Sequence, residues 1–89
     1  MSIDVSEIAI MPIKPVGSLV AFVGCVIDRK FYIGGIALHS DAKSRSFRLT
    51  YPVKQLGDGK QVPLFHPIER NAGEAIQKAV IAEWERLIQ

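Results

Sequence analysis

The chain has 89 residues, of which 48% are hydrophobic and 22% charged, and its formal net charge is +2. This length suits a single domain over residues 1–89 with a small core, and the composition excludes a disordered or low-complexity chain. A single cysteine excludes an internal disulfide. The charge-free run from Val16 to Ile27 is too short for a membrane helix, which needs about 20 residues.

Two extended segments are predicted in the first third of the chain. The first runs from Val5 to Met11 and is stopped by Pro12 and Pro15. Proline lacks the amide hydrogen that a sheet ladder needs, so Pro12 suits the end of a strand or an edge strand. The second runs from Leu19 to Ile27 and is apolar on both faces. This predicts a central strand that is covered twice, either by a helix on one side and a partner chain on the other or within a rolled sheet. One face consists of Leu19, Ala21, Val23, Cys25 and Ile27, and the other of Val20, Phe22 and Val26.

A hairpin is predicted between this segment and a third one, Phe31–Leu38, because only a short polar break separates them. Gly34 and Gly35 within the third segment predict a bulge or a sharp bend. The polar stretch from His39 to Ser46 predicts a loop. The next segment alternates, so that Phe47, Leu49 and Tyr51 share one face and Arg48 projects from the opposite one.

The last third of the chain combines a glycine-rich turn, a short strand and a helix. The turn covers Lys54–Lys60, and Gln61–Phe65 is expected to return as a strand. Asn71 followed by Glu74 matches a capping box at the start of the helix. Together the elements predict an α+β fold, in which one C-terminal helix packs on a twisted antiparallel sheet of about five strands. The apolar stripe of the helix consists of Ala72, Ala75, Ile76, Ala79, Val80, Trp84 and Leu87, and we expect Ile76 and Trp84 to be buried against the sheet.

Few side chains in this sequence suit catalysis. Cys25 lies in an apolar run without a basic neighbour, so it is interpreted as a small buried side chain rather than a nucleophile. His39, Asp41 and His66 lack the spacing of a metal site, and the glycines around Asp58 lack the context of a phosphate loop. We therefore expect no enzyme, no metal or cofactor and no small-molecule substrate.

Positive charge is concentrated between residues 41 and 60. This stretch carries five cations and two carboxylates, whereas residues 1–40 are neutral in sum. Two interpretations remain open. The segment either attracts a polyanion, or its lysines and arginines keep edge strands from aggregating.

The string Phe65-His66-Pro67-Ile68 joins the last predicted strand to the helix. Pro67 favours an extended conformation at His66. We expect a packed corner to which Phe65 and Ile68 both contribute, with the imidazole hydrogen-bonded to the backbone.

This string belongs to a longer series of matching segments. Pro52-Val53-Lys54, Gly59-Lys60, His66-Pro67-Ile68 and Ile76-Gln77-Lys78-Ala79-Val80 occur in an order that resembles the stage V sporulation protein G (SpoVG) family, also called septation proteins. The resemblance runs nearly end to end. It implies a small α+β domain that forms homodimers through its sheet and regulates septation, sporulation and gene expression by binding DNA and RNA.

At the matching positions, the resemblance implies nucleic-acid contacts at Lys54 and Lys60 and at Lys78 on the helix. Two features, a single residue and a pair, depart from the family pattern. Gln55 stands where an arginine often follows the turn lysine, and Gly34–Gly35 replaces a more polar pair.

We therefore expect a homodimeric, nucleic-acid-binding regulator with contacts at Arg48, Lys54, Lys60 and Lys78 and no membrane partner. Tyr32 or Tyr51 would stack on bases if the target is single-stranded. The alternative is an interaction module that acts on division or sporulation factors without touching nucleic acid. The acidic residues near the N-terminus do not fit a secretory signal, which predicts a cytoplasmic protein.

Overall fold

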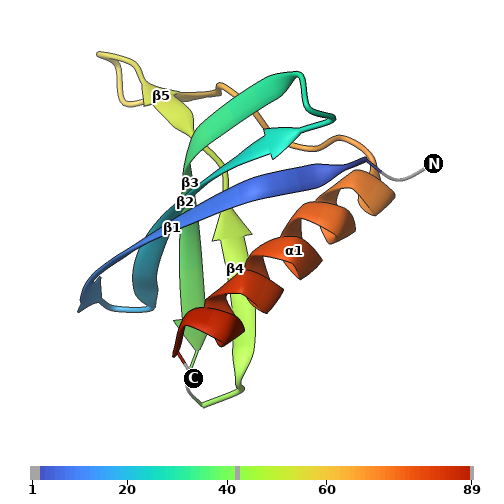
Figure 1. The fold of residues 1–89 in the computed structure, drawn as a ribbon. Helices are drawn as coiled ribbons and strands as arrows, with labels where there is room; N and C mark the ends of the chain where they lie inside the picture. Colours follow the sequence, from blue (N-terminus) through green and yellow to red (C-terminus); the bar gives the residue numbers. More distant parts are fainter. Residues whose placement is uncertain (1–2, 42, 89) are drawn as a thin grey trace.

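A computed structural model describes residues 3–41 and 43–88 of the chain (Figure 1). Strands β1 to β4 form one antiparallel sheet in sequence order, and β5 and β6 form a separate hairpin. Helix α1 lies across one face of the larger sheet and contacts β1 and β4. The predicted α+β fold is thus confirmed, with a four-stranded and a two-stranded sheet in place of one sheet of about five strands. The elements are β1 (Val5–Val16), β2 (Leu19–Ile27), β3 (Phe31–Asp41), β4 (Ser46–Thr50), β5 (Val53–Gln55), β6 (Gln61–Pro63) and α1 (Arg70–Ile88).

Strand β1 continues through both of its prolines and ends at Val16, so the prediction that it stops at Pro12 is wrong. Pro12 lies opposite Ala21 of β2. Because β1 is an edge strand, it has a neighbour on one side only, and a proline that lacks an amide hydrogen is tolerated there.

The predicted hairpin between β2 and β3 is confirmed. Lys30 N donates a hydrogen bond to Ile27 O over 3.0 Å, and Asp28 and Arg29 between them have φ values of 52° and 57°. Two successive positive φ values are typical of a type I′ turn, whose twist matches that of the flanking strands.

The predicted bulge at Gly34–Gly35 is also confirmed. Val23 of β2 pairs with Ile36, and Cys25 pairs with Ile33, so two residues of β3 lie opposite one residue of β2. Gly35 has a φ of +76°, which a residue with a side chain adopts only with strain.

Strand β3 is longer than predicted, because it includes His39 to Asp41. These residues pair with Arg48, Phe47 and Ser46 of β4, and the residues from Lys43 to Arg45 are assigned to the turn. The predicted loop from His39 to Ser46 is therefore wrong in its extent. Backbone pairing does not depend on side-chain polarity, so polar residues at the end of a hairpin remain in the ladder.

The core lies between α1 and the sheet face that it covers. Ile76 and Val80 of α1 are 1% and 0% exposed, whereas Trp84 is partly buried against the same cluster. The grouping of β2 side chains differs from prediction at one end: Leu19 lies opposite His39 and Ala21 opposite Leu38, which leaves Val20 as a bulge. Val20 consequently packs on the core, together with the β2 side chains that face α1. The sheet residues of the core are Ala21, Val23, Cys25, Ile27, Ile33, Ile36 and Leu38.

Helix α1 begins at Arg70, so the capping box predicted at Asn71 is wrong. Gly73 N donates to Glu69 O over 3.1 Å, which makes Glu69 the residue that precedes the first turn. Glu74 instead accepts a hydrogen bond from Arg70 Nε at 3.1 Å. In the part of the chain that the structure describes, no helix is long and apolar enough to cross a membrane.

Candidate nucleic-acid interface

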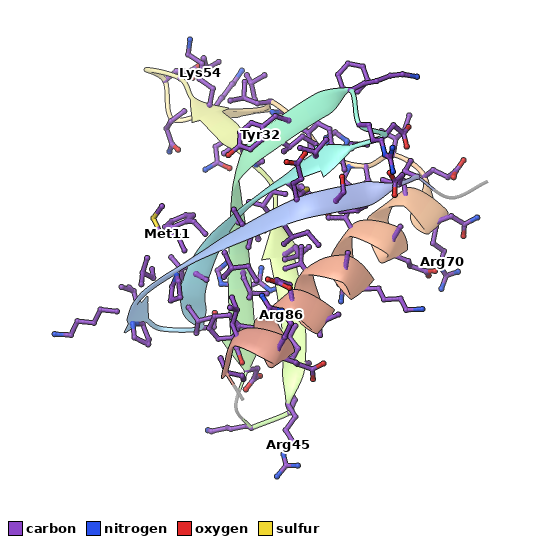
Figure 2. All side chains as sticks on the ribbon, in the orientation of Figure 1. Met11, Tyr32, Arg45, Lys54, Arg70 and Arg86 are labelled. Carbon is purple, nitrogen blue, oxygen red and sulfur yellow. The ribbon has the colours of Figure 1, made fainter. Side chains whose placement is uncertain are left out.

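Lys54 and Lys60 lie on the β5–β6 hairpin, which projects beyond the end of the larger sheet (Figure 2). Lys54 is part of β5 rather than of the turn, and it pairs with Val62. Lys60 precedes β6, where its amide donates to Asp58 Oδ1 over 3.1 Å and its carbonyl accepts from Leu56 N over 2.7 Å. The hairpin thus holds the two backbones in place while both lysine side chains are exposed.

A second group of cations occupies the opposite end of the molecule. Lys43 and Arg45 lie in the turn between β3 and β4, and Arg48 lies on β4 opposite His39. Figure 2 shows Arg45 and Lys54 at opposite ends, because the extended chain of β4 and β5 runs between them. The basic segment of residues 41–60 therefore forms two separate cationic groups and not one patch.

Lys78 occupies a third position, on the exposed surface of α1 beside Glu74 and Gln77. Phe47 packs on the core beneath α1, and its carbonyl accepts a hydrogen bond from Gln77 Nε2 at 3.5 Å. Arg48 has the opposite parity on β4, so Lys78 and Arg48 lie on different faces of the sheet. One straight strand of nucleic acid would not follow a single face through all four predicted contacts.

The cations of residues 41–60 are exposed and carry no ion pair within the described part of the chain. The three ion pairs there join Arg29 to Asp4 at 3.7 Å, Arg70 to Glu74 at 3.1 Å and Arg86 to Glu83 at 2.6 Å. Hydrogen bonding to Arg86 is the main reason that the pKa of Glu83 lies below its usual value. Within residues 41–60, the cations left without such partners are Lys43, Arg45, Arg48, Lys54 and Lys60; outside this stretch, Lys14, Lys30 and Lys78 also take part in none of these three ion pairs.

The surroundings of His39 and His66 are not those of metal ligands. His39 Nδ1 lies 3.0 Å from Ser18 Oγ, and His39 Nε2 lies 3.2 Å from Thr50 Oγ1, so both ring nitrogens are already engaged. His66 is exposed at the entry to α1. Across residues 3–41 and 43–88, no three histidine, cysteine or acidic side chains gather where a metal ion would be held.

The corner before α1 is packed only in part. The Phe65 and Tyr51 rings lie 6.0 Å apart between centroids, and Pro67 lies against Gly73 in the first turn of the helix. Ile68, however, is 92% exposed, so its predicted packing in this corner is wrong. Ile68 directly precedes the bend at Glu69 that leads into α1, and its side chain lies in solvent there.

The sheet face opposite α1 is left open by this chain. Met11 is 67% exposed, Phe22 40% and Tyr32 72%, and a hollow of about 390 Å³ lies among them. The Tyr32 ring lies over Gly24 and Gly34: a Cβ on these glycines would meet Tyr32 Oη at 2.5 and 3.0 Å. Tyr51 is half-buried instead, and its burial raises the pKa of its phenol above the usual value. Of the two tyrosines that were expected to stack on bases, Tyr32 is thus the exposed one and Tyr51 is not.

Comparison with known proteins covers almost the whole chain. The SpoVG family model matches residues 3–86, which include the hairpin and all the cations described above. A protein of Archaeoglobus fulgidus named "Putative septation protein SpoVG" is 26% identical over 82 residues, which cover 92% of this chain and 94% of that protein.

Proposed function

The chain belongs to the SpoVG family, and on that premise we propose that it is a homodimeric cytoplasmic regulator linked to septation or sporulation, which acts by binding DNA or RNA. It acts by binding and not as an enzyme. The observation that carries the proposal is the set of five exposed cations between residues 41 and 60 that take part in no ion pair of the described chain. Cations that are already free of carboxylate partners bind phosphate without first breaking an ion pair.

The hairpin is the main contact in this proposal. Lys54 and Lys60 extend from a projecting two-stranded element, where a phosphate backbone has room to approach from several directions. Such contacts fix the position of the strand without reading its bases, so the affinity depends on salt more than on sequence. Arg48 and Lys78 would add contacts only for a nucleic acid that bends around the domain or bridges two copies.

The open sheet face is assigned to the second copy of the chain. Met11, Phe22 and Tyr32 expose large side chains together on this face, and a contiguous exposed apolar patch is typical of an interaction surface. The strand beneath them, β2, is apolar on both faces, and α1 covers only one of these. A second copy that covers the open face would complete the core of this small domain.

Fluorescence anisotropy with labelled DNA and RNA tests the nucleic-acid part of the proposal. The logarithm of the binding constant, plotted against the logarithm of the salt concentration between about 50 and 200 mM, has a slope set by the number of phosphate contacts. We expect Lys54→Ala with Lys60→Ala to weaken binding to all duplex sequences alike and to reduce that slope by about 2.

The matched control is Lys14→Ala with Lys30→Ala, which removes two other exposed lysines outside the basic segment. It should leave the slope of the wild type almost unchanged. No binding by the wild type at the lowest salt, or the same slope in both double variants, would contradict the proposal.

A second candidate function is an interaction module for other proteins. The observation in its favour is the apolar surface of the hairpin region, where Val53 is 45% exposed, Leu64 63% and Ile68 92%. This function would be preferred if the wild type is a dimer that binds no nucleic acid at low salt.

A further inference from the structure

A hollow lies at the end of the sheet opposite the hairpin. Its volume is about 740 Å³, and it extends over the end of β3 between the β1–β2 turn and β4. Ligand sites for small molecules usually have volumes of about 300–1,000 Å³, so this hollow is large enough for a nucleotide. Its lining includes Ser18, His39, Asp41, Lys43, Ser46 and Arg48.

A chain of hydrogen bonds holds the floor of the hollow in place. Ser40 N donates to Ser18 O over 2.8 Å, which ties the β1–β2 turn to β3. His39 lies between Ser18 Oγ and Thr50 Oγ1, at 3.0 and 3.2 Å, and so links that turn to β4. Three separate segments are therefore fixed relative to one another before any ligand arrives, which lowers the entropic cost of binding.

The charges of the hollow favour an anion. Lys43 and Arg48 both line it, and neither takes part in an ion pair of the described residues. Asp41 is the carboxylate of the lining, and its Oδ1 accepts a hydrogen bond from Lys43 N at 2.9 Å. One oxygen of Asp41 is thus already hydrogen-bonded within the turn. Two cations and one carboxylate give the lining of the hollow a net positive charge.

We propose that this hollow binds a phosphate group, of a mononucleotide or of a nucleic-acid strand, through Arg48 and Lys43. The planar guanidinium of Arg48 offers paired N–H donors to two phosphate oxygens, and the Lys43 ammonium offers a mobile point charge. The Ser18 and Ser46 hydroxyls supply further donors along the rim. The inference deepens the proposed function, because Arg48 is one of its predicted contacts, but the hollow is separate from the hairpin.

Amide NMR titrations of the full chain test this site with three probes: inorganic phosphate, adenosine 5′-monophosphate and a short single strand without terminal phosphates. We expect saturable shifts at the amides of Ser18, Ser46 and Arg48. Lys43→Ala with Arg48→Ala should weaken this binding by at least about tenfold, and Arg48→Lys should weaken it less because the charge remains. Lys54→Ala with Lys60→Ala is the control and should leave the response to inorganic phosphate or the mononucleotide unchanged.

The probes separate the two sources of phosphate. Saturation by the mononucleotide identifies a terminal phosphate as the ligand, and saturation by the single strand alone identifies an internal one. The absence of saturable shifts at the hollow with all three probes, or equal shifts in the Lys43→Ala, Arg48→Ala protein, would overturn the inference. The proposed function fails separately, if the salt dependence of duplex binding does not respond to the loss of Lys54 and Lys60.

Discussion

The side chain of Cys25 is fully buried on β2, among the apolar residues that face α1. Its burial confirms the interpretation of this cysteine as a small core residue and raises the pKa of its thiol above the usual 9.0, because the thiolate would lose its hydration. Tyr51 shares this environment, and the pKa of its phenol is raised first by burial and then by the charge of Cys25. The pKa values of both side chains are thus raised mainly because the fold buries them.

We expect the thiol of Cys25 to react slowly with a disulfide reagent in the native protein. The thiolate is the reactive form. Burial raises the pKa of the thiol, which lowers the fraction of thiolate, and it also keeps the reagent from reaching the sulfur. The rate should therefore follow the opening of the fold and rise steeply in denaturant. The absorbance of the chromophore that the reagent releases measures this rate. Fast labelling under native conditions would show that the core does not enclose Cys25.

The raised pKa values of Cys25 and Tyr51 also predict a loss of stability in alkali. Both groups keep their protons in the folded chain at pH values where the unfolded chain has lost them. Their contribution is therefore fully present below the unfolded values of 9.0 and 10.0 and decreases as the pH rises through the folded ones. Urea unfolding across this range should show the decrease, and Tyr51→Phe should make it smaller; an identical decrease in that variant would contradict the prediction.

Glycine at position 35 serves the bulge of β3, where φ is +76°. Gly35→Ala should destabilise the domain by about 1–2 kcal/mol, the cost of a left-handed conformation for a residue with a Cβ. Gly57→Ala is the matched control, because a Cβ there would meet nothing within 4 Å. Urea denaturation compares the two variants, and equal stabilities would mean that the bulge relaxes without cost.

At the scale of elements, α1 is attached to the sheet by a narrow set of side chains. Ile76 and Val80 are fully buried, Trp84 lies partly in solvent, and Leu87 is 45% exposed. The contact is therefore tightest in the middle of the helix and weaker toward its C-terminal end. The periodicity of the sequence identified this stripe correctly, but not the gradual loss of burial along it.

Ile76→Ala should accordingly cost about 2–5 kcal/mol, as expected for a fully buried side chain. Trp84→Ala should cost less than the about 3–5 kcal/mol typical of a large buried aromatic, because part of its ring is already in water. Glu85→Ala, on the exposed side of α1, is the control and should change stability by no more than about 0.5 kcal/mol. A larger loss for Trp84 than for Ile76 in denaturant titrations would contradict this order.

At the scale of the whole molecule, the domain leaves one face of a four-stranded sheet uncovered. The molecule extends over 43 × 34 × 21 Å, and its thin dimension holds only two layers, α1 and the sheet. The apolar side chains of Met11, Phe22 and Tyr32 lie on the side without a helix. The proposed homodimer would add the missing layer.

Sedimentation at micromolar concentration should therefore give a mass near twice 9.8 kDa. Phe22→Asp should shift the equilibrium toward the monomer, because it places a carboxylate in the centre of the open face. Leu87→Asp is the control, since it changes an exposed apolar residue of similar exposure on α1. A monomeric wild type, or equal dissociation in both variants, would exclude the open face as the dimer surface.

Local signals were sufficient for much of this fold. The bounds of β2, the hairpin to β3, the bulge at Gly34–Gly35 and the stripe of α1 depend on side-chain period and turn chemistry within a few residues, and these are legible in sequence. The continuation of β1 through Pro12 could not be read from local signals, because a proline is tolerated in an edge strand and excluded from a central one. The bulge at Val20 likewise depends on another strand, because it arises from the pairing of Leu19 with His39 and of Ala21 with Leu38 in β3.

The same distinction applies to the candidate interface. Composition located the positive charge between residues 41 and 60, and the family resemblance singled out Lys54 and Lys60. Neither could show that β4 carries the chain from one end of the molecule to the other and so separates Arg48 from these lysines. Distance along the sequence does not measure distance in space, because an extended strand places its ends far apart while a turn brings remote residues such as Ser18 and His39 within 3.0 Å.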